Sequence, residues 1–388
     1  MRIWWILAAA AVVLLEALPP AVAADGPKTQ PAAGVPKEHL AQLRRGLNLS
    51  MWWAQLPPDE KRFRTFVTAE DAKRIADMGF TFVRLPVDPV ALADPNDAGR
   101  LNAARMNLFD ASLDLFTKRG VAVIVCPYLG DEPKHTLFTD HKVRARFLAF
   151  WRTLAGHLAK RPTNRIFLQV MNEPNISVQQ VWDILQERLV DAIRRAAPKH
   201  TIIAAANLRS GGRWDPVGGF CAGAPVEDRN VIYDLHFYDP VQFTHQGANW
   251  MMREVHALQS LPYPSDPQKL RPHLAKTLDA RSRAFAALYG QERWNRQRIE
   301  KQILRAAAWG REHKVPILCG EFGCFGKFAP AADRVRYLAD VRHVLEKHGI
   351  GWAMWDYFGS FGVVVEEDGK RVIDEKTLEA LIPRETRD

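Results

Sequence analysis

The sequence predicts a (β/α)8 barrel with one long insertion between its sixth and seventh strands. Short apolar and β-branched runs alternate with longer amphipathic stretches, which is typical of an α/β protein. Eight such runs occur, and most are almost continuously apolar, as strands buried on both faces are. The alternative, a doubly wound open sheet, usually has a Gly-rich phosphate loop after its first strand. Trp52 and Trp53 stand at that place instead, so we prefer the barrel.

The expected elements follow one another along the chain in strand–helix order. Strands are predicted at residues 45–53, 80–87, 121–129, 166–174, 201–207, 231–240, 315–323 and 351–359. Helices are predicted at 69–78, 102–119, 177–197 and 331–347, because apolar residues recur there at helical spacing. Gly79, Gly120 and Gly349 follow three of these helices and are expected to end them.

The insertion has two parts. Residues 244–269 contain Pro262, Pro264 and Pro267 and are expected to form a loop, whereas residues 271–312 have a helical pattern. The composition does not change along this region, so we predict a single barrel domain at residues 37–388.

The N-terminus has the pattern of a secretory signal peptide. Arg2 precedes an apolar run at residues 3–15, and an Ala-x-Ala type of cleavage site ends at Ala24. Residues 25–36 are rich in Pro, Gly and Ala and are predicted to be a linker. We therefore expect a secreted or periplasmic protein with no membrane contact beyond the signal segment.

The overall composition is that of an ordinary globular protein, with 47% hydrophobic and 25% charged residues in 388. The net charge of +9 is spread along the chain, which favours a solvated basic surface, although an acidic polysaccharide partner stays open; no nucleic-acid partner is expected. Four cysteines, Cys126, Cys221, Cys319 and Cys324, allow three pairings into two disulfides, and the sequence does not choose among them. Their spacing does not predict a metal site, and no cofactor is expected.

Polar side chains end several of the predicted strands, where a (β/α)8 barrel carries its active site. These strand-end residues are Arg84, Asn172, Glu173, His236, Tyr238, Glu321 and Trp355. A carboxylate at the end of an apolar strand is costly to desolvate. Glu173 and Glu321 both stand at such ends, and this points to a shared chemical role.

Six short motifs carry a family resemblance that covers the whole mature chain. They are Gly-Leu-Asn-Leu at 46–49, Phe-Val-Arg-Leu-Pro-Val at 82–87, Met-Asn-Glu-Pro at 171–174, Leu-His-Phe-Tyr at 235–238, Gly-Glu-Phe-Gly at 320–323 and Trp-Ala-Met-Trp at 352–355. In this order and at strand ends, they make the chain resemble glycoside hydrolase family 5, the cellulase family.

The resemblance implies a retaining hydrolysis of β-glycosidic bonds, with Glu173 as the general acid/base and Glu321 as the nucleophile. Such an enzyme holds its two carboxyl groups about 5–5.5 Å apart. By the same resemblance, Arg84 and Tyr238 assist Glu321, His236 lies near Glu173, and Asn172 binds the sugar 2-hydroxyl.

The substrate-binding residues are expected above these strand ends. The resemblance places Trp355 under the reacting sugar and implies a histidine at the end of strand three, where this chain has Tyr128. Aromatic faces stack on sugar rings, so Trp53, Trp214 and Trp250 are predicted subsite residues, and His245 is placed on the same rim.

The expected activity is an endo-β-1,4-glucanase acting on a β-linked polysaccharide or oligosaccharide. A β-mannanase, a β-1,3-glucanase and a transglycosylase of the same family stay open. A non-catalytic polysaccharide-binding barrel is the alternative from another class, and it predicts the loss of one catalytic carboxylate. A barrel lyase or isomerase is disfavoured, because such an enzyme needs a phosphate-binding loop or a metal cluster and the sequence predicts neither.

Overall fold

The computed structural model describes residues 34–94, 97–276 and 279–384. The predicted signal peptide at residues 1–24 and the linker up to residue 33 lie outside this range. Within it, no helix is both long enough and apolar enough to cross a bilayer.

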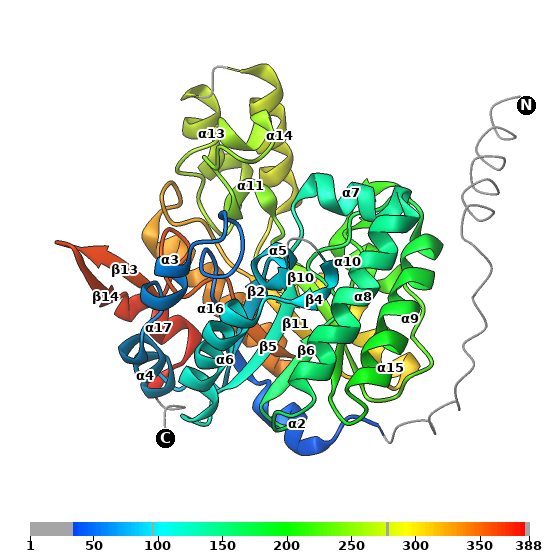
Figure 1. The fold of residues 1–388 in the computed structure, drawn as a ribbon. Coiled ribbons are helices and arrows are strands. Elements are labelled where there is room, and N and C mark those ends of the chain that lie inside the picture. The colour runs from blue at the N-terminus through cyan, green and yellow to red at the C-terminus, as the bar shows by residue number, and fades with distance from the viewer. Residues whose placement is uncertain (1–33, 95–96, 277–278, 385–388) are drawn as a thin grey trace, which may run out of the picture.

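Eight parallel strands close into a barrel, as the sequence predicts (Figure 1). The strands are β1 (Arg45–Asn48), β2 (Phe82–Val87), β5 (Ala122–Pro127), β6 (Ile166–Gln169), β7 (Ile202–Ala205), β10 (Val231–Phe237), β11 (Ile317–Phe322) and β12 (Gly351–Met354). All eight predicted strands are confirmed, although each ladder is shorter than the apolar run that predicted it. Most of the extra residues form the loops at the barrel mouth. Glu173, Tyr238 and Trp355 lie on these loops, whereas Arg84, His236 and Glu321 lie on the strands themselves.

The helices outside the insertion surround the barrel. They are α2 (Lys37–Gln42), α3 (Glu60–Thr65), α4 (Ala69–Asp77), α5 (Pro89–Leu92), α6 (Ala103–Thr117), α7 (Asp131–Thr139), α8 (His141–Leu158), α9 (Gln179–Ala196), α10 (Pro216–Ala222), α15 (Arg296–His313), α16 (Ala331–Lys347) and α17 (Glu375–Leu381). The four helices predicted from apolar spacing are present within two residues at either end. Gly79, Gly120 and Gly349 have positive φ angles of 89°, 79° and 69°, as helix-ending glycines do.

The insertion is more helical than predicted. It contains α11 (Val241–Thr244), α12 (Arg253–His256), α13 (Pro267–Lys276) and α14 (Ala280–Glu292), of which α13 and α14 rise from the barrel as a lobe (Figure 1). The expectation of one continuous loop at residues 244–269 was wrong. Pro267 counted as a loop signal, but it is the first residue of α13, a position where proline loses no hydrogen bond.

Three small hairpins were not predicted. They are β3 (Ala93–Asp94) with β4 (Asp97–Leu101), β8 (Arg209–Ser210) with β9 (Arg213–Trp214), and β13 (Val364–Glu367) with β14 (Lys370–Ile373). Gly211 and Gly212 connect β8 and β9 with positive φ angles of 55° and 76°, a pair that favours a two-residue hairpin turn. This signal was present in the sequence, but the strands on either side are too short to show a pattern.

The barrel interior changes from apolar to polar along its axis. A lower layer contains Phe82, Ile124, Phe167 and Ile232 among other buried apolar residues. Two residues further along the same strands stand Arg84, Cys126, Gln169 and Asp234, which point to the same side because side chains alternate along a strand. The polar layer is therefore held over a packed apolar floor.

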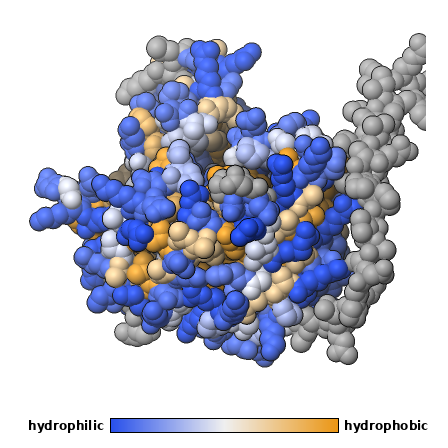
Figure 2. Space-filling view, in the orientation of Figure 1, coloured by the Kyte–Doolittle hydropathy of each residue, from blue (hydrophilic) through white to orange (hydrophobic). Residues whose placement is uncertain are grey.

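The surface and the cysteines complete the fold. Hydrophilic residues cover most of the face in Figure 2, including much of the α13–α14 lobe and the β13–β14 hairpin. All four cysteines are unpaired, and Cys126, Cys319 and Cys324 are buried, so none of the three considered pairings is formed.

Candidate active site

Glu321 lies at the mouth of the barrel with both of its carboxylate oxygens engaged. Arg84 Nη1 donates to Oε1 at 2.6 Å, and the hydroxyl of Tyr238 donates to Oε2 at 2.9 Å. The side chains of Arg84 and Glu321 are 0% and 6% exposed. These two fixed donors, one of them a permanent cation, stabilise the ionised form of Glu321 and hold its orientation.

Glu173 faces the same space from the end of β6. His236 Nδ1 lies 2.8 Å from Glu173 Oε1 and 3.5 Å from Glu321 Oε2. The backbone of Glu173 has a φ of +46°, in the left-handed region that costs a non-glycine residue roughly 1–2 kcal/mol. Such strained residues cluster at functional sites, where the surrounding structure holds them in place.

Asn172 is fixed by one end of its amide and free at the other. Its Oδ1 accepts from Arg84 Nη2 at 2.8 Å, whereas its buried Nδ2 has no hydrogen-bond partner within the structure. Since buried polar atoms are normally paired, this donor is available to a substrate oxygen.

A second set of polar residues lies beneath these side chains, and sequence reasoning missed it. Asn48 and Gln169 accept from Arg84 at 2.9 and 2.7 Å. Asp234 accepts from Gln169, from the amide of Gly320 and, at 3.3 Å, faces His236 Nε2. A Cβ on Gly320 would collide with the carboxylate of Asp234, which explains the glycine before Glu321.

Asp234 had a signal in the sequence. It stands two residues before His236 on β10, and the alternation of side chains directs both to the inside of the barrel. A carboxylate at an inward position next to a predicted active-site histidine is therefore a candidate from the sequence alone.

The protons of the site are distributed between the histidine and the two glutamates. Burial by itself lowers the pKa of His236, but the charges of Glu321 and Asp234 outweigh it and raise the pKa to about 10. Burial raises the pKa of Glu173, but the hydrogen bond from His236 outweighs it and lowers the pKa to about 2. The imidazole of His236 and the carboxyl group of Glu173 therefore share a proton across the 2.8 Å hydrogen bond between them.

The remaining titrating groups are set by burial. Burial and the charge of Glu321 raise the pKa of Tyr238, so its phenol stays a donor. Burial raises the pKa of Glu321, and the cations His236 and Arg84 act against this effect.

Glu173, His236 and Glu321 approach one another closely. One side-chain oxygen or nitrogen atom of each residue lies within 4.8 Å of those of the other two. This close approach of the two carboxyl groups corresponds to the separation of about 5–5.5 Å that a retaining glycosidase uses. The same three residues have the chemistry of metal ligands, but both oxygens of Glu321 already accept hydrogen bonds from Arg84 and Tyr238. The donor set therefore fits a carboxylate pair better than a cation site.

The structure places four of the predicted substrate-binding residues around this group. Trp355 is half-buried directly after β12, and Tyr128 is half-buried directly after β5. The ring of His245 is 5.0 Å from the ring of Tyr238. Trp250 is 58% exposed, and its ring is 4.9 Å from that of Phe325, in a cluster that also includes Phe361 and Trp355.

The other two predicted aromatic residues have different environments. Trp214 is 54% exposed on the β8–β9 hairpin, where it pairs with Arg209. The interpretation of Trp53 as a subsite residue was wrong, because this side chain is 1% exposed. It is stacked on Phe63 at 3.9 Å and donates to Ser112 at 3.3 Å, so no face of the ring is available to a sugar.

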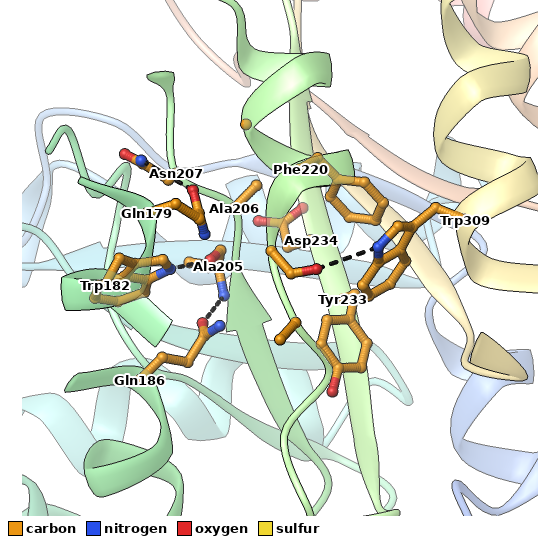
Figure 3. A pocket seen from close by; sticks show the side chains of 13 residues that line it. Gln179, Trp182, Gln186, Ala205, Ala206, Asn207, Phe220, Tyr233, Asp234 and Trp309 are labelled. Carbon is orange, nitrogen blue, oxygen red and sulfur yellow. Dashed lines mark hydrogen bonds between the residues drawn. The ribbon is translucent and has the colours of Figure 1, made fainter. Parts of the chain in front are cut away.

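A separate small cavity lies behind the barrel wall, between α9, α10, β7 and β10 (Figure 3). Its volume is about 20 Å³, and its lining includes Gln179, Trp182, Phe220, Tyr233 and Trp309. This is room for about one water molecule. The cavity is too small for a sugar and is not the candidate active site.

Comparison with known proteins agrees with this geometry. The chain matches the cellulase family (glycosyl hydrolase family 5) over residues 46–360. Endoglucanase 3 of Fibrobacter succinogenes is 28% identical over 350 residues, which are 85% of this chain and 51% of that protein, so the chain spans about half of its length. Endoglucanase C of Acetivibrio thermocellus is 26% identical over 354 residues, which are 87% of this chain and 97% of that protein.

Solved structures show the same fold. The structure of Thermotoga maritima Cel5A in complex with cellobiose has a TM-score of 0.71 and 24% identity, and the match covers 89% of this chain and 99% of that one. Barrel, site and family match together define a glycoside hydrolase. Specifically, the chain belongs to the cellulase family, glycosyl hydrolase family 5.

Proposed function

We propose that this protein is a retaining endo-β-1,4-glucanase in which Glu321 is the nucleophile and Glu173 the general acid/base. The observation that carries this proposal is the carboxylate pair within 4.8 Å, with Glu321 held by Arg84 and Tyr238. The endoglucanase names of the relatives support the choice of a β-1,4-glucan.

The first step forms a glycosyl-enzyme. A carboxylate oxygen of Glu321 bonds to the anomeric carbon while the glycosidic C–O bond breaks, and the leaving oxygen takes a proton from Glu173. His236 Nδ1 lies 2.8 Å from Glu173 Oε1, so the histidine passes a proton to Glu173 through this hydrogen bond. Glu173 and His236 thus act as one acid.

The second step releases the sugar. Glu173 accepts a proton from a water molecule, the water oxygen bonds to the anomeric carbon, and the ester bond to Glu321 breaks. While Glu321 is esterified it carries no charge. One of the two anions that raise the pKa of His236 is then absent, until Glu321 is ionised again. The unpaired Nδ2 of Asn172 is proposed to donate to the sugar 2-hydroxyl in both transition states.

The experiment compares the wild type with Glu321→Gln on β-1,4-glucan, mixed-linkage glucan, β-1,3-glucan and β-mannan. We expect cleavage of the β-1,4-linked glucans with an early fall in viscosity, which is the sign of internal cuts. Cleavage of mannan alone would show that the substrate is β-mannan and not β-1,4-glucan. Binding without cleavage by the wild type would favour the non-catalytic barrel.

We further propose that the chain is exported and that residues 37–388 form its single catalytic domain. The n-region, apolar run and cleavage pattern of residues 1–24 support export. Mass determination of the protein after secretion tests this proposal, and a mature N-terminus near Asp25 is expected. Retention of the uncleaved chain in the cytoplasm, with Met1 intact, would contradict export.

A further inference from the structure

Lys134 is a buried cation that the proposed reaction does not use. It lies on α7, which directly follows β5 and Tyr128, and its side chain is on the same helix face as Leu137 and Phe138. Those two residues are buried apolar anchors, and Lys134 itself is only 8% exposed. A lysine is rarely found at such a position, because removing an ammonium group from water is costly unless it is paired.

The stem of Lys134 is buried, but its ammonium group reaches solvent, because Nζ is not one of the fully buried polar atoms without a partner. Among the residues that the structure describes, the ammonium group of Lys134 takes part in no ion pair or hydrogen bond. Nζ lies 5.7 Å from the centroid of the Tyr128 ring. A contact of this kind attracts the cation and leaves its three N–H donors to water or to a ligand.

The place of Lys134 relative to the reaction follows from its neighbours. Tyr128 stands at the strand end where the family resemblance implies a histidine, and the charges of Glu173 and Glu321 act on its phenol. Lys134 in turn is close enough to Glu173 to favour its ionised form, yet it is not within ion-pair distance.

We propose that Lys134 and the hydroxyl of Tyr128 form a binding site for a carboxylate-bearing sugar unit of the polymer, next to the scissile bond. The site makes the enzyme select an acidic β-glucan over a neutral one. A carboxylate would replace water at this ammonium group, which has no ion-pair partner among the described residues, and the net charge of +9 attracts an anionic polymer over longer distances. This inference rests on the proposed hydrolysis of a β-linked glucan.

The test uses two soluble β-1,4-glucans that differ in charge, carboxymethyl-cellulose and neutral hydroxyethyl-cellulose. In Lys134→Met, kcat/KM on the carboxymethyl polymer is expected to fall at least about tenfold more than on the neutral polymer. Lys134→Arg keeps the charge and is expected to retain most of the preference. The matched control is Lys142→Met, which removes a solvent-exposed lysine from the start of the neighbouring α8.

A second measurement needs no variant. Raising the salt concentration is expected to reduce the preference of the wild type for the charged polymer, and to change the ratio of Lys134→Met less, because only the remaining net charge attracts the polymer there. A glucan oxidised at C6 to glucuronate carries its carboxylate on the ring, so comparison with the carboxymethyl polymer tells a uronic acid from an acidic substituent.

The outcomes separate the two proposals. If the wild type cleaves neither polymer, the proposed function fails. If it cleaves both and Lys134→Met loses the same factor on each, the selection of an acidic sugar is overturned and Lys134 acts on Glu173 or on local packing.

Discussion

The floor and the rim of the candidate cleft are built on different principles. The floor consists of polar side chains on strand ends, almost fully buried, and Arg84 alone contacts Asn48, Gln169, Asn172 and Glu321. The rim consists of aromatic side chains on loops, such as Trp250, which is 58% exposed and contacts the rings of Phe325 and Phe361.

This difference teaches where chemistry and substrate choice reside. Catalytic groups need positions fixed to a fraction of an ångström, and the barrel strands with their cross-linked polar layer supply them. Sugar-stacking residues need only a face of the right orientation, which a loop can present and change at little cost to the fold. The variants below affect the two regions to very different degrees.

The largest effect is expected in the floor from Glu321→Gln. The amide keeps the shape of the side chain but cannot form the glycosyl ester, so kcat should fall by about 10⁴-fold or more on every substrate. Thermal unfolding should change little by comparison. Glu366→Gln, on the exposed β13–β14 hairpin, is the matched control and should retain full activity.

Glu173→Gln should cost less and should depend on the leaving group. Loss of a general acid lowers the rate by about 10²–10⁴-fold. An aryl β-glucoside oligomer with a good leaving group needs little proton donation, so its cleavage should slow less than that of the polymer. Equal losses on both substrates would contradict the assigned role of Glu173.

Asp234→Asn tests the layer beneath the floor. Asp234 raises the pKa of His236, which is about 10 in the wild type, so its neutralisation should lower that pKa. The alkaline limb of the kcat/KM profile should move to lower pH, with a loss of about tenfold at neutral pH. Asp239→Asn, at the end of the same strand, should leave the alkaline limb where it is.

The same interaction sets the pH dependence of stability. Because the pKa of His236 in the fold lies above its ordinary value of 6.5, its contribution is complete below about pH 6.5 and is lost as the pH rises through about 10. In Asp234→Asn this loss should begin at lower pH. Coincident melting profiles of both proteins between pH 7 and 10 would contradict the link.

The smallest effects on the reaction are expected at the rim, where two tryptophans give the sharpest contrast. Trp250→Ala should raise KM by about 2–10-fold, with little change in kcat or in stability. Trp53→Ala should destabilise the fold by about 3–5 kcal/mol and leave KM unchanged in the folded fraction. A rise in KM with Trp53→Ala would show that Trp53 contacts the substrate, contrary to its burial in the structure.

The sequence by itself determined the barrel, the eight strands and the strand-end polar residues. These follow from local patterns, namely apolar runs, helical spacing and terminal glycines, which act within a few residues of the chain. The start of α13 was mistaken because the first turn of a helix and a loop accept proline equally well.

Only the tertiary structure decided which strand-end residues meet and which are buried. Trp53 and Trp250 both follow strands in loop-like sequence, yet one is 1% and the other 58% exposed, because Phe63 from α3 covers the first. The same holds for two buried charged residues. Asp234 accepts from the distant Gly320 and faces His236, whereas Lys134 has only the ring of Tyr128 beside it and no ion pair among the described residues. Burial and pairing are properties of segments brought together by folding, so no local pattern specifies them.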